Sequence, residues 1–230
     1  MAQTTTYDSL VFDSVRGLGN THFLSSSLTN AEGVNSVNGN ISAWAIDGYT
    51  MIAPSATDAQ NASGQTFVSW GWKANGGTTT TNDASSTGVG SIDSVYQANT
   101  TAGFSIVSYT GNATAGATVG HGLTVAPEML LVKRRDNGAA KDWAVYHHNM
   151  STDPKTDYLV LNTTAAGVDD VGLWNDTAPT ANVFSIGNWS GINASGATYI
   201  AYAFHSVEGY SKFGSYTGNA NADGTFVYTG

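Results

Sequence analysis

The side chains best suited to chemistry in this sequence are its five histidines and a scattered set of carboxylates. His147 and His148 follow Tyr146, while His121 and Asp142 stand apart from them. A metal site needs three or four convergent ligands, and no repeated spacing supplies them here. The chain has no cysteine, which excludes disulfides, thiolate ligands and thiol nucleophiles. We therefore expect turn or surface histidines, no metal site and no catalytic residue.

The carboxylates offer two further kinds of site. Oxygen-rich loops run from Asp136 to Asp142 and from Asp169 to Asp176, and Ca²⁺ prefers such ligands. No EF-hand spacing is present, and Asp and Asn in loops chiefly form turns. Glycoside hydrolysis needs two facing carboxyl groups, but the only glutamates are Glu32, Glu128 and Glu208. We expect no enzymatic activity and no cofactor, with calcium as the one ion that these loops would suit.

Aromatic side chains in polar loops are the best candidates for binding. Trp174 and Trp189 lie among Asn, Asp, Ser and Gly, where an exposed ring is unfavourable unless it meets a partner. We predict that Trp174, Trp189, Asn175 and Asp176 bind glycan, the alternative being that the two rings pack within their own loops.

The chain has one cationic cluster, Lys133-Arg134-Arg135. Such a cluster would either hold an anionic glycan or prevent edge-to-edge association at the end of a strand. The formal net charge of −9 makes nucleic acid an unlikely partner. No apolar run reaches the ~20 residues of a membrane helix, and the N-terminus lacks a signal-peptide pattern, so we expect a protein made in the cytoplasm without membrane insertion.

The sequence repeats itself. Asn61-Ala62-Ser63-Gly64 and the alternating segment 65–72 return as Asn193-Ala194-Ser195-Gly196 and the segment 197–204. Val11-Phe12-Asp13 and His22-Phe23-Leu24 also have counterparts, at 145–147 and 157–159, and the segment 108–113 returns at 215–220. Self-similarity of this kind indicates an array that serves as a scaffold or a multivalent binder.

Short alternating segments between Gly and Asn turns predict an all-β protein, an antiparallel β-sandwich of the jelly-roll or lectin-like kind built from a repeated unit. We expect residues 1–74 to be the second half of one unit and 75–102 to be a Gly/Ser/Thr-rich linker. Residues 103–208 would form a complete sandwich, and 209–230 the opening strands of a further unit. In the first part, we expect Asp47-Gly48 to form a type I′ hairpin turn. Residues 65–73 should be a strand with Trp70 and Trp72 in the core.

Several blocks of the sequence resemble a repeat common in marine bacteriophage virion proteins. They include residues 103–111, Val119 to Leu123, Val132 to Asp136 and Glu208 to Gly218. The resemblance implies a tail, fibre or structural protein with lectin-like, concanavalin A-like domains, and it implies no catalytic residue.

We therefore expect a non-enzymatic structural protein of a virion, located in a tail fibre, an appendage or a capsid decoration, with adhesion to host glycan. Its partners would be other copies of itself and other virion proteins. The candidate assembly residues are Phe213, Tyr216, Phe226 and Tyr228, which would complete the N-terminal half within the chain or between chains. The alternatives are a phage depolymerase that cleaves host-surface polysaccharide and a stand-alone carbohydrate-binding module.

Overall fold

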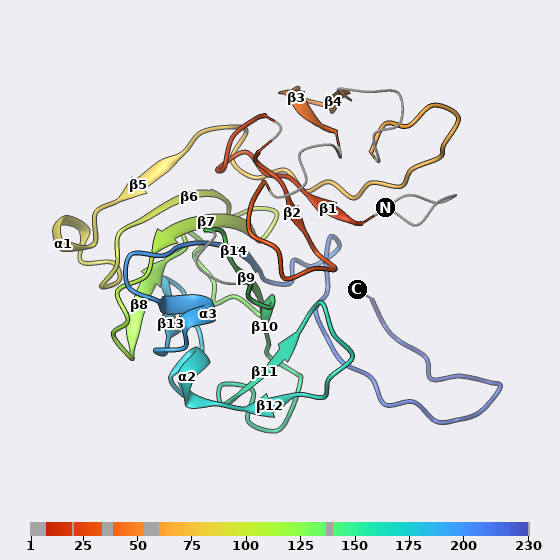
Figure 1. The fold of residues 1–230 in the computed structure, drawn as a ribbon. Helices are drawn as coiled ribbons and strands as arrows, with labels where there is room; N and C mark the ends of the chain where they lie inside the picture. Colours follow the sequence, from red (N-terminus) through yellow and green to blue (C-terminus); the bar gives the residue numbers. More distant parts are fainter. Residues whose placement is uncertain (1–7, 20, 34–38, 53–59, 137–139, 230) are drawn as a thin grey trace.

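The computed structural model describes residues 8–19, 21–33, 39–52, 60–136 and 140–229. Its centre is one antiparallel sheet of eight strands in the order β12-β11-β10-β9-β14-β7-β6-β5 (Figure 1). These strands are β5 (Thr80–Asn82), β6 (Ser94–Asn99), β7 (Phe104–Thr110), β9 (Met129–Arg134), β10 (Ala144–His147), β11 (Asp157–Val160), β12 (Val168–Asp169) and β14 (Thr198–Phe204). The prediction of an all-β, antiparallel fold is confirmed.

A second layer covers one face of this sheet. It consists of the paired strands β8 (Ala117–Gly120) and β13 (Val183–Ile186) with the short helices α2 (Val171–Trp174) and α3 (Ser190–Asn193). Alternate side chains of the large sheet, such as Val107, Leu130 and Tyr199, meet this layer in a buried cluster. The result is a β-sandwich with an apolar core on this side.

The N-terminal segment covers the opposite face. Strands β1 (Leu10–Val11) and β2 (Leu24–Ser25) form a small antiparallel pair, and Leu24 packs in a second cluster with Phe104, Ile200 and Tyr202. The indole Nε1–H of Trp143, which is also buried there, donates to the carbonyl of Ser25 at 2.8 Å. Both faces of the large sheet are therefore covered.

Buried charges fix this N-terminal cover. The side chain of Arg16 is fully buried and pairs with Asp13, and it also donates to the Tyr202 hydroxyl at 3.2 Å. The Tyr202 hydroxyl donates to Asp13 Oδ2 at 2.6 Å. Glu32 accepts from Arg16 at 3.3 Å and from Arg135 at 2.7 Å. The network joins residues 13–32 to the centre and to one end of the large sheet.

Lys133 makes a second attachment on the same face. Its fully buried ammonium donates to the carbonyl of Thr29 at 2.9 Å and to the carbonyl of Lys141. Burial lowers the pKa of Lys133 from 10.5 to about 8, against the opposing attraction of Asp142. Arg134 pairs with Asp136, and Arg135 pairs with Glu32. All three side chains of the cationic cluster Lys133-Arg134-Arg135 therefore bind groups within the protein.

The N-terminal third departs from the prediction beyond residue 33. Strands β3 (Asn40–Trp44) and β4 (Tyr49–Ile52) form the expected hairpin, but neither Asp47 nor Gly48 has a positive φ, so the type I′ turn is wrong. Residues 65–73 form no named strand, and Trp70 and Trp72 are 59% and 53% exposed. The counterpart segment, β14, is buried because it lies between β7 and β9. Residues 65–73 are not a strand of that sheet in the described chain, although the Trp72 ring contacts Phe104 and Phe204 at its end.

The predicted linker at 75–102 is also wrong. Strands β5 and β6 lie within it and extend the large sheet beyond β7. Between them, α1 (Ala84–Thr87) begins at Asp83, whose carboxylate accepts from the amides of Ser85 and Ser86. The polar composition concealed β5, because its side chains at the sheet edge are polar on both faces. Strand β6 does carry apolar side chains, and Tyr96 and Ala98 pack on the first core cluster.

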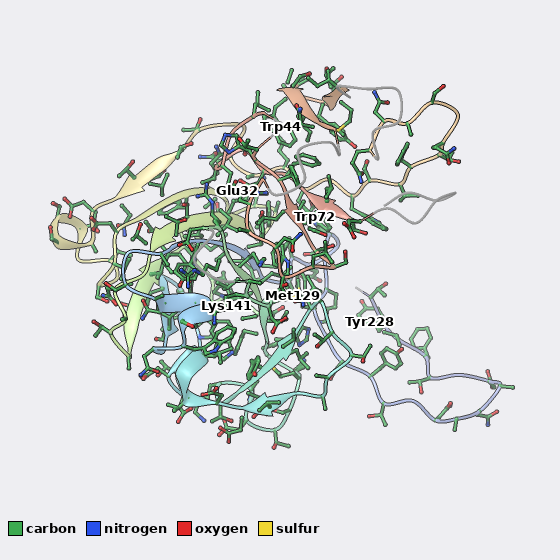
Figure 2. The ribbon with its side chains drawn as sticks, viewed as in Figure 1. Glu32, Trp44, Trp72, Met129, Lys141 and Tyr228 are labelled. Atoms are coloured by element: carbon green, nitrogen blue, oxygen red, sulfur yellow. The ribbon has the colours of Figure 1, made fainter. Side chains whose placement is uncertain are left out.

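The C-terminal residues form an arm in place of the expected opening strands. Phe213 packs on Phe204 with ring centres 5.6 Å apart, and its carbonyl lies 3.1 Å from His148 Nε2. Beyond it, residues 214–229 leave the body of the molecule without forming a strand (Figure 1). Figure 2 shows Tyr228 near the end of this arm, where the chain has turned back toward the body, and Trp44 and Trp72 on the N-terminal part. We call residues 214–229 the C-terminal arm.

Arg16→Met tests the buried network. Removing one partner leaves the Asp13 carboxylate without its compensating charge, so we expect a loss of about 3–5 kcal/mol in the free energy of unfolding in urea. Lys155→Met, which breaks the exposed pair with Asp153, is the control and should cost at most about 1 kcal/mol. Equal effects of the two substitutions would show that the network does not hold the N-terminal segment.

Lys133→Met tests the second attachment through its pH dependence. Lys133 has a lower pKa in the folded protein, about 8, than its ordinary value of 10.5. Between these values the unfolded chain binds more protons, so the contribution of Lys133 to stability rises with pH. We expect the free energy of unfolding of the native protein, relative to Lys133→Met, to increase from pH 8 to 10.5. The same comparison with Lys73→Met, which removes an exposed lysine, is the control, and a flat difference for Lys133→Met would contradict the assignment.

Candidate functional site

The structure places Trp174 in the core. Asp170 begins α2 by accepting from the amide of Gly172 at 2.8 Å, and the single helical turn directs the indole inward. Trp174 is 1% exposed, its Nε1–H donates to the carbonyl of Asp157 at 3.0 Å, and its ring meets Tyr146 edge-on at 5.9 Å. The prediction that Trp174 stacks on glycan is wrong, and the alternative of local packing holds.

Asn175 and Asp176 reverse the chain after α2. Both residues adopt left-handed conformations, with φ of 53° and 48°, and the amide of Asn175 donates to the carbonyl of Val171 at 3.1 Å. Asn and Asp tolerate this conformation better than other side chains. Asn175 is half-buried and Asp176 is exposed. Their main role in the structure is therefore to form a turn, with the Asp176 carboxylate at the surface.

Trp189 is the one predicted tryptophan that reaches the surface. It is half-buried against the first core cluster, 6.5 Å from the ring of Tyr158. The ammonium of Lys141 lies 5.8 Å from the centre of the Trp189 ring, a cation–π contact. The backbone amide of Trp189 donates to the carbonyl of Gly172 at 2.9 Å, which attaches the start of α3 to α2. The structure thus joins an aromatic pair and one cation on the same side of the sandwich.

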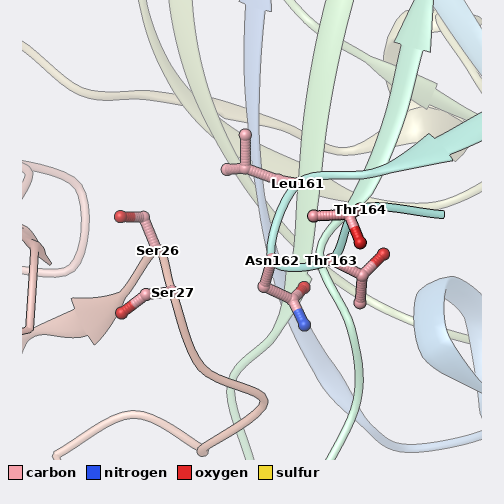
Figure 3. Close-up of a pocket in the computed structure, with 6 residues that line it drawn as sticks. All are labelled: Ser26, Ser27, Leu161, Asn162, Thr163 and Thr164. Carbon is pink, nitrogen blue, oxygen red and sulfur yellow. The ribbon is translucent and has the colours of Figure 1, made fainter.

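A hollow that sequence reasoning missed lies between the N-terminal segment and the loop after β11. It has a volume of about 420 Å³, it is open to solvent, and its walls carry hydroxyl, amide and apolar groups (Figure 3). The lining residues are Ser26, Ser27, Leu161, Asn162, Thr163 and Thr164.

This hollow is connected to Trp189 through two neighbouring residues. Asn162 accepts from the amide of Trp143 and donates to Asp142 at 2.8 Å, and Lys141, next to Asp142, covers the Trp189 ring. We refer to Trp189, Tyr158 and Lys141 together with the hollow as the Trp189 face, although none of these three residues lines the hollow. The only signal in the sequence was the match between residues 22–24 and 157–159, because the two walls directly follow these segments.

The remaining polar candidates are engaged inside the protein. His121 is buried, accepts at Nδ1 from the amide of Leu123 at 3.1 Å, and has its pKa lowered to about 4 by burial, so it is neutral at pH 7. The Glu128 carboxylate accepts from the amide and the hydroxyl of Ser206. Across the described ranges, no three His, Asp or Glu side chains gather as metal ligands would.

The described chain also holds no helix of the length and hydropathy needed to cross a membrane. Among known proteins, no curated sequence and no solved structure matches this chain. One family model does match, over residues 2–230, almost the full sequence given. The chain therefore belongs to the family described as a domain of unknown function, DUF7483.

Proposed function

We propose that this chain is a non-enzymatic structural protein of a bacteriophage particle, in a tail fibre, an appendage or a capsid decoration, and that it adheres to host glycan. The resemblance of residues 103–111, 119–123, 132–136 and 208–218 to a virion repeat supports the origin. The all-β sandwich supplies a rigid body that suits such a role.

The observation that carries the proposal is the C-terminal arm. Tyr216, Phe226 and Tyr228 are 70%, 87% and 70% exposed on a segment that leaves the body (Figure 2). Large apolar side chains gathered at a surface mark contacts with other macromolecules. Of the four predicted assembly residues, Phe213 alone packs on the body. The partners of the arm are other copies of this chain and other proteins of the particle.

The Trp189 face supports the adhesive part of the proposal. Sugars stack their apolar faces on aromatic rings and bond their hydroxyls to hydroxyl and amide groups. Trp189 and Tyr158 supply the rings, and Ser27, Asn162 and Thr163 supply polar groups in the hollow. Lys141 adds a positive charge, which favours a glycan that carries carboxylates.

The carboxylates support binding over turnover. Hydrolysis of a glycosidic bond needs one carboxyl group as acid and a second as base or nucleophile on a facing wall. Glu32 is paired with two arginines, and Glu128 accepts two hydrogen bonds from Ser206. Neither glutamate lines the hollow described above.

Two measurements test the proposal. Antibody raised against this chain should label particles of the phage that encodes it, in a repeated pattern visible by electron microscopy. Host-surface polysaccharide incubated with the protein should bind without release of new reducing ends. Release of reducing ends would instead identify a depolymerase, and unlabelled particles would remove the structural assignment.

Trp189→Ala tests the Trp189 face. Loss of a stacking ring should weaken adsorption to host polysaccharide by about 1–3 kcal/mol. The control is Trp44→Ala, on the β3–β4 hairpin, which should leave adsorption unchanged. Thermal unfolding of each variant separates lost binding from lost folding, because Trp189 also packs on the core. Equal adsorption by a folded Trp189→Ala protein would contradict the assignment.

A further inference from the structure

The ring of Trp189 lies against a glycine. Gly191 is in α3, where glycine is less favourable than alanine, and its φ is not in the left-handed region that would require glycine. A Cβ atom at this position would lie 1.9 Å from Cζ3 of Trp189, so a side chain there would displace the ring. Because Gly191 has no side chain, the indole packs directly on the backbone of α3. The ring is thus held in place before a ligand arrives, which lowers the entropy lost on binding.

Lys141 covers this ring from a fixed backbone. Its amide donates to the carbonyl of Thr29 at 3.2 Å, and its carbonyl accepts from the buried ammonium of Lys133. Its side chain reaches Trp189, where the ammonium lies 5.8 Å from the ring centre. Figure 2 shows Lys141 beside α3. The backbone of Lys141 is therefore attached to the N-terminal segment and to β9, and only its side chain has to move for the ring to be uncovered.

The charge of Lys141 has no carboxylate partner. No salt bridge among the described residues includes Lys141, whereas Arg134 and Arg135 are both paired. The neighbouring carboxylate, that of Asp142, accepts from the side-chain amide of Asn162 at 2.8 Å. A cation–π contact that is open to water is a weak attraction. The ammonium of Lys141 can therefore leave the ring for a carboxylate on a ligand.

Tyr158 supplies a second ring beside the covered one. Its centre is 6.5 Å from that of Trp189, and the two ring planes are 34° apart. Across the described ranges, no cation lies over the Tyr158 ring. A polysaccharide that stacks one sugar on Tyr158 can bring a neighbouring sugar to Trp189, and hence to the ammonium of Lys141.

We propose that Lys141 is a gate that selects glycans carrying carboxylates. A sugar that stacks on the part of the Trp189 ring beneath the ammonium must first move the ammonium aside. A carboxylate on the sugar compensates for this displacement, because the released ammonium pairs with it beside the ring. A neutral sugar displaces the cation and gains no ion pair. Lys141 is therefore the residue that determines specificity at this surface.

This inference rests on the proposed adhesion to host glycan. It deepens that proposal by naming the class of ligand, a polysaccharide of uronic acids or of other acidic sugars, and the residue that distinguishes this class from neutral polysaccharide.

Polygalacturonate and its methyl ester are the probes, because they share a sugar chain and differ in the charge of the carboxyl groups. Lys141→Met removes the charge and keeps an unbranched side chain on the ring, and Lys141→Ala removes both. The formal net charge of −9 repels the acidic polymer in every variant, so the ratios of dissociation constants between variants are compared.

We expect the native chain to bind polygalacturonate about tenfold more tightly than Lys141→Met does, because a hydrogen bond between charged groups is lost. On the methyl ester, Lys141→Ala should bind about threefold more tightly than both the native chain and Lys141→Met, because its ring is uncovered. Lys73→Met, which removes an exposed lysine, should match the native chain on both polymers. Thermal unfolding confirms that each variant folds.

Salt gives an independent readout of the charge. The difference between the native chain and Lys141→Met on polygalacturonate should shrink as salt is added, because salt screens an ion pair at the surface. Binding of the ester by Lys141→Ala should change little. A difference on polygalacturonate that persists unchanged at high salt would show that Lys141 acts through packing, and it would overturn the gate.

Three further results would overturn the inference: no binding of polygalacturonate by the native chain, equal binding by the native chain and Lys141→Met, and no gain of Lys141→Ala on the ester. If one of them occurs while host polysaccharide adsorbs to the native chain and less to Trp189→Ala, the gate is wrong and the proposed function stands. If host polysaccharide does not adsorb to the native chain, the adhesive function is wrong, whatever the two probes show.

Discussion

The arrangement of this molecule depends on one buried cation. Arg16 lies between the N-terminal segment and the large sheet, where it meets Asp13 and the hydroxyl of Tyr202 on β14. Burial holds the pKa of Tyr202 well above its usual value, so the phenol keeps its proton and donates it in a hydrogen bond to Asp13. A buried charge without a partner is strongly unfavourable. The N-terminal segment can therefore leave the sheet only if the bonds among Arg16, Asp13 and Tyr202 break or become exposed to solvent. These bonds hold the segment on the face of β14 that carries Tyr202.

The same requirement explains why a conspicuous cationic run is not a binding surface. On the face covered by the N-terminal segment, Lys133 donates hydrogen bonds to the carbonyls of Thr29 and Lys141, and Arg135 donates to Glu32. These contacts attach the N-terminal segment to β9 and bring Ser26 and Ser27 opposite Asn162 and Thr163, so that a hollow forms between them. The hollow is thus a consequence of how the cover is held, and its walls come from segments about 135 residues apart in the sequence.

The sequence predicted the fold class and most strands of the complete unit, since alternation there coincides with burial on both sides: Phe104, Leu130 and Ile200 are buried as expected. Local alternation could not show whether a neighbouring strand is present, and for this reason residues 65–73 were wrongly placed in a core. Polar strands such as β5 escaped detection because their side chains lack an apolar face. Trp174 shows the opposite error. Its neighbours in the sequence are polar, which predicted an exposed ring, but one helical turn directs the ring into the core.

The repeated segments separate what a few residues determine from what the whole fold determines. Val11 pairs with Leu24 as Val145 pairs with Leu159, at equivalent positions of the two copies. Gly64 and Gly196, which end the two Asn-Ala-Ser-Gly segments, have nearly equal φ, and so do Ala113 and Ala220. Hydrogen bonds within four residues and glycine at positive φ suffice to make such pieces. Burial does not follow from them: Asn193 ends α3 and is buried by contact with Asn112 and Ala113, whereas Asn61 precedes the same three residues, follows no helix and is exposed.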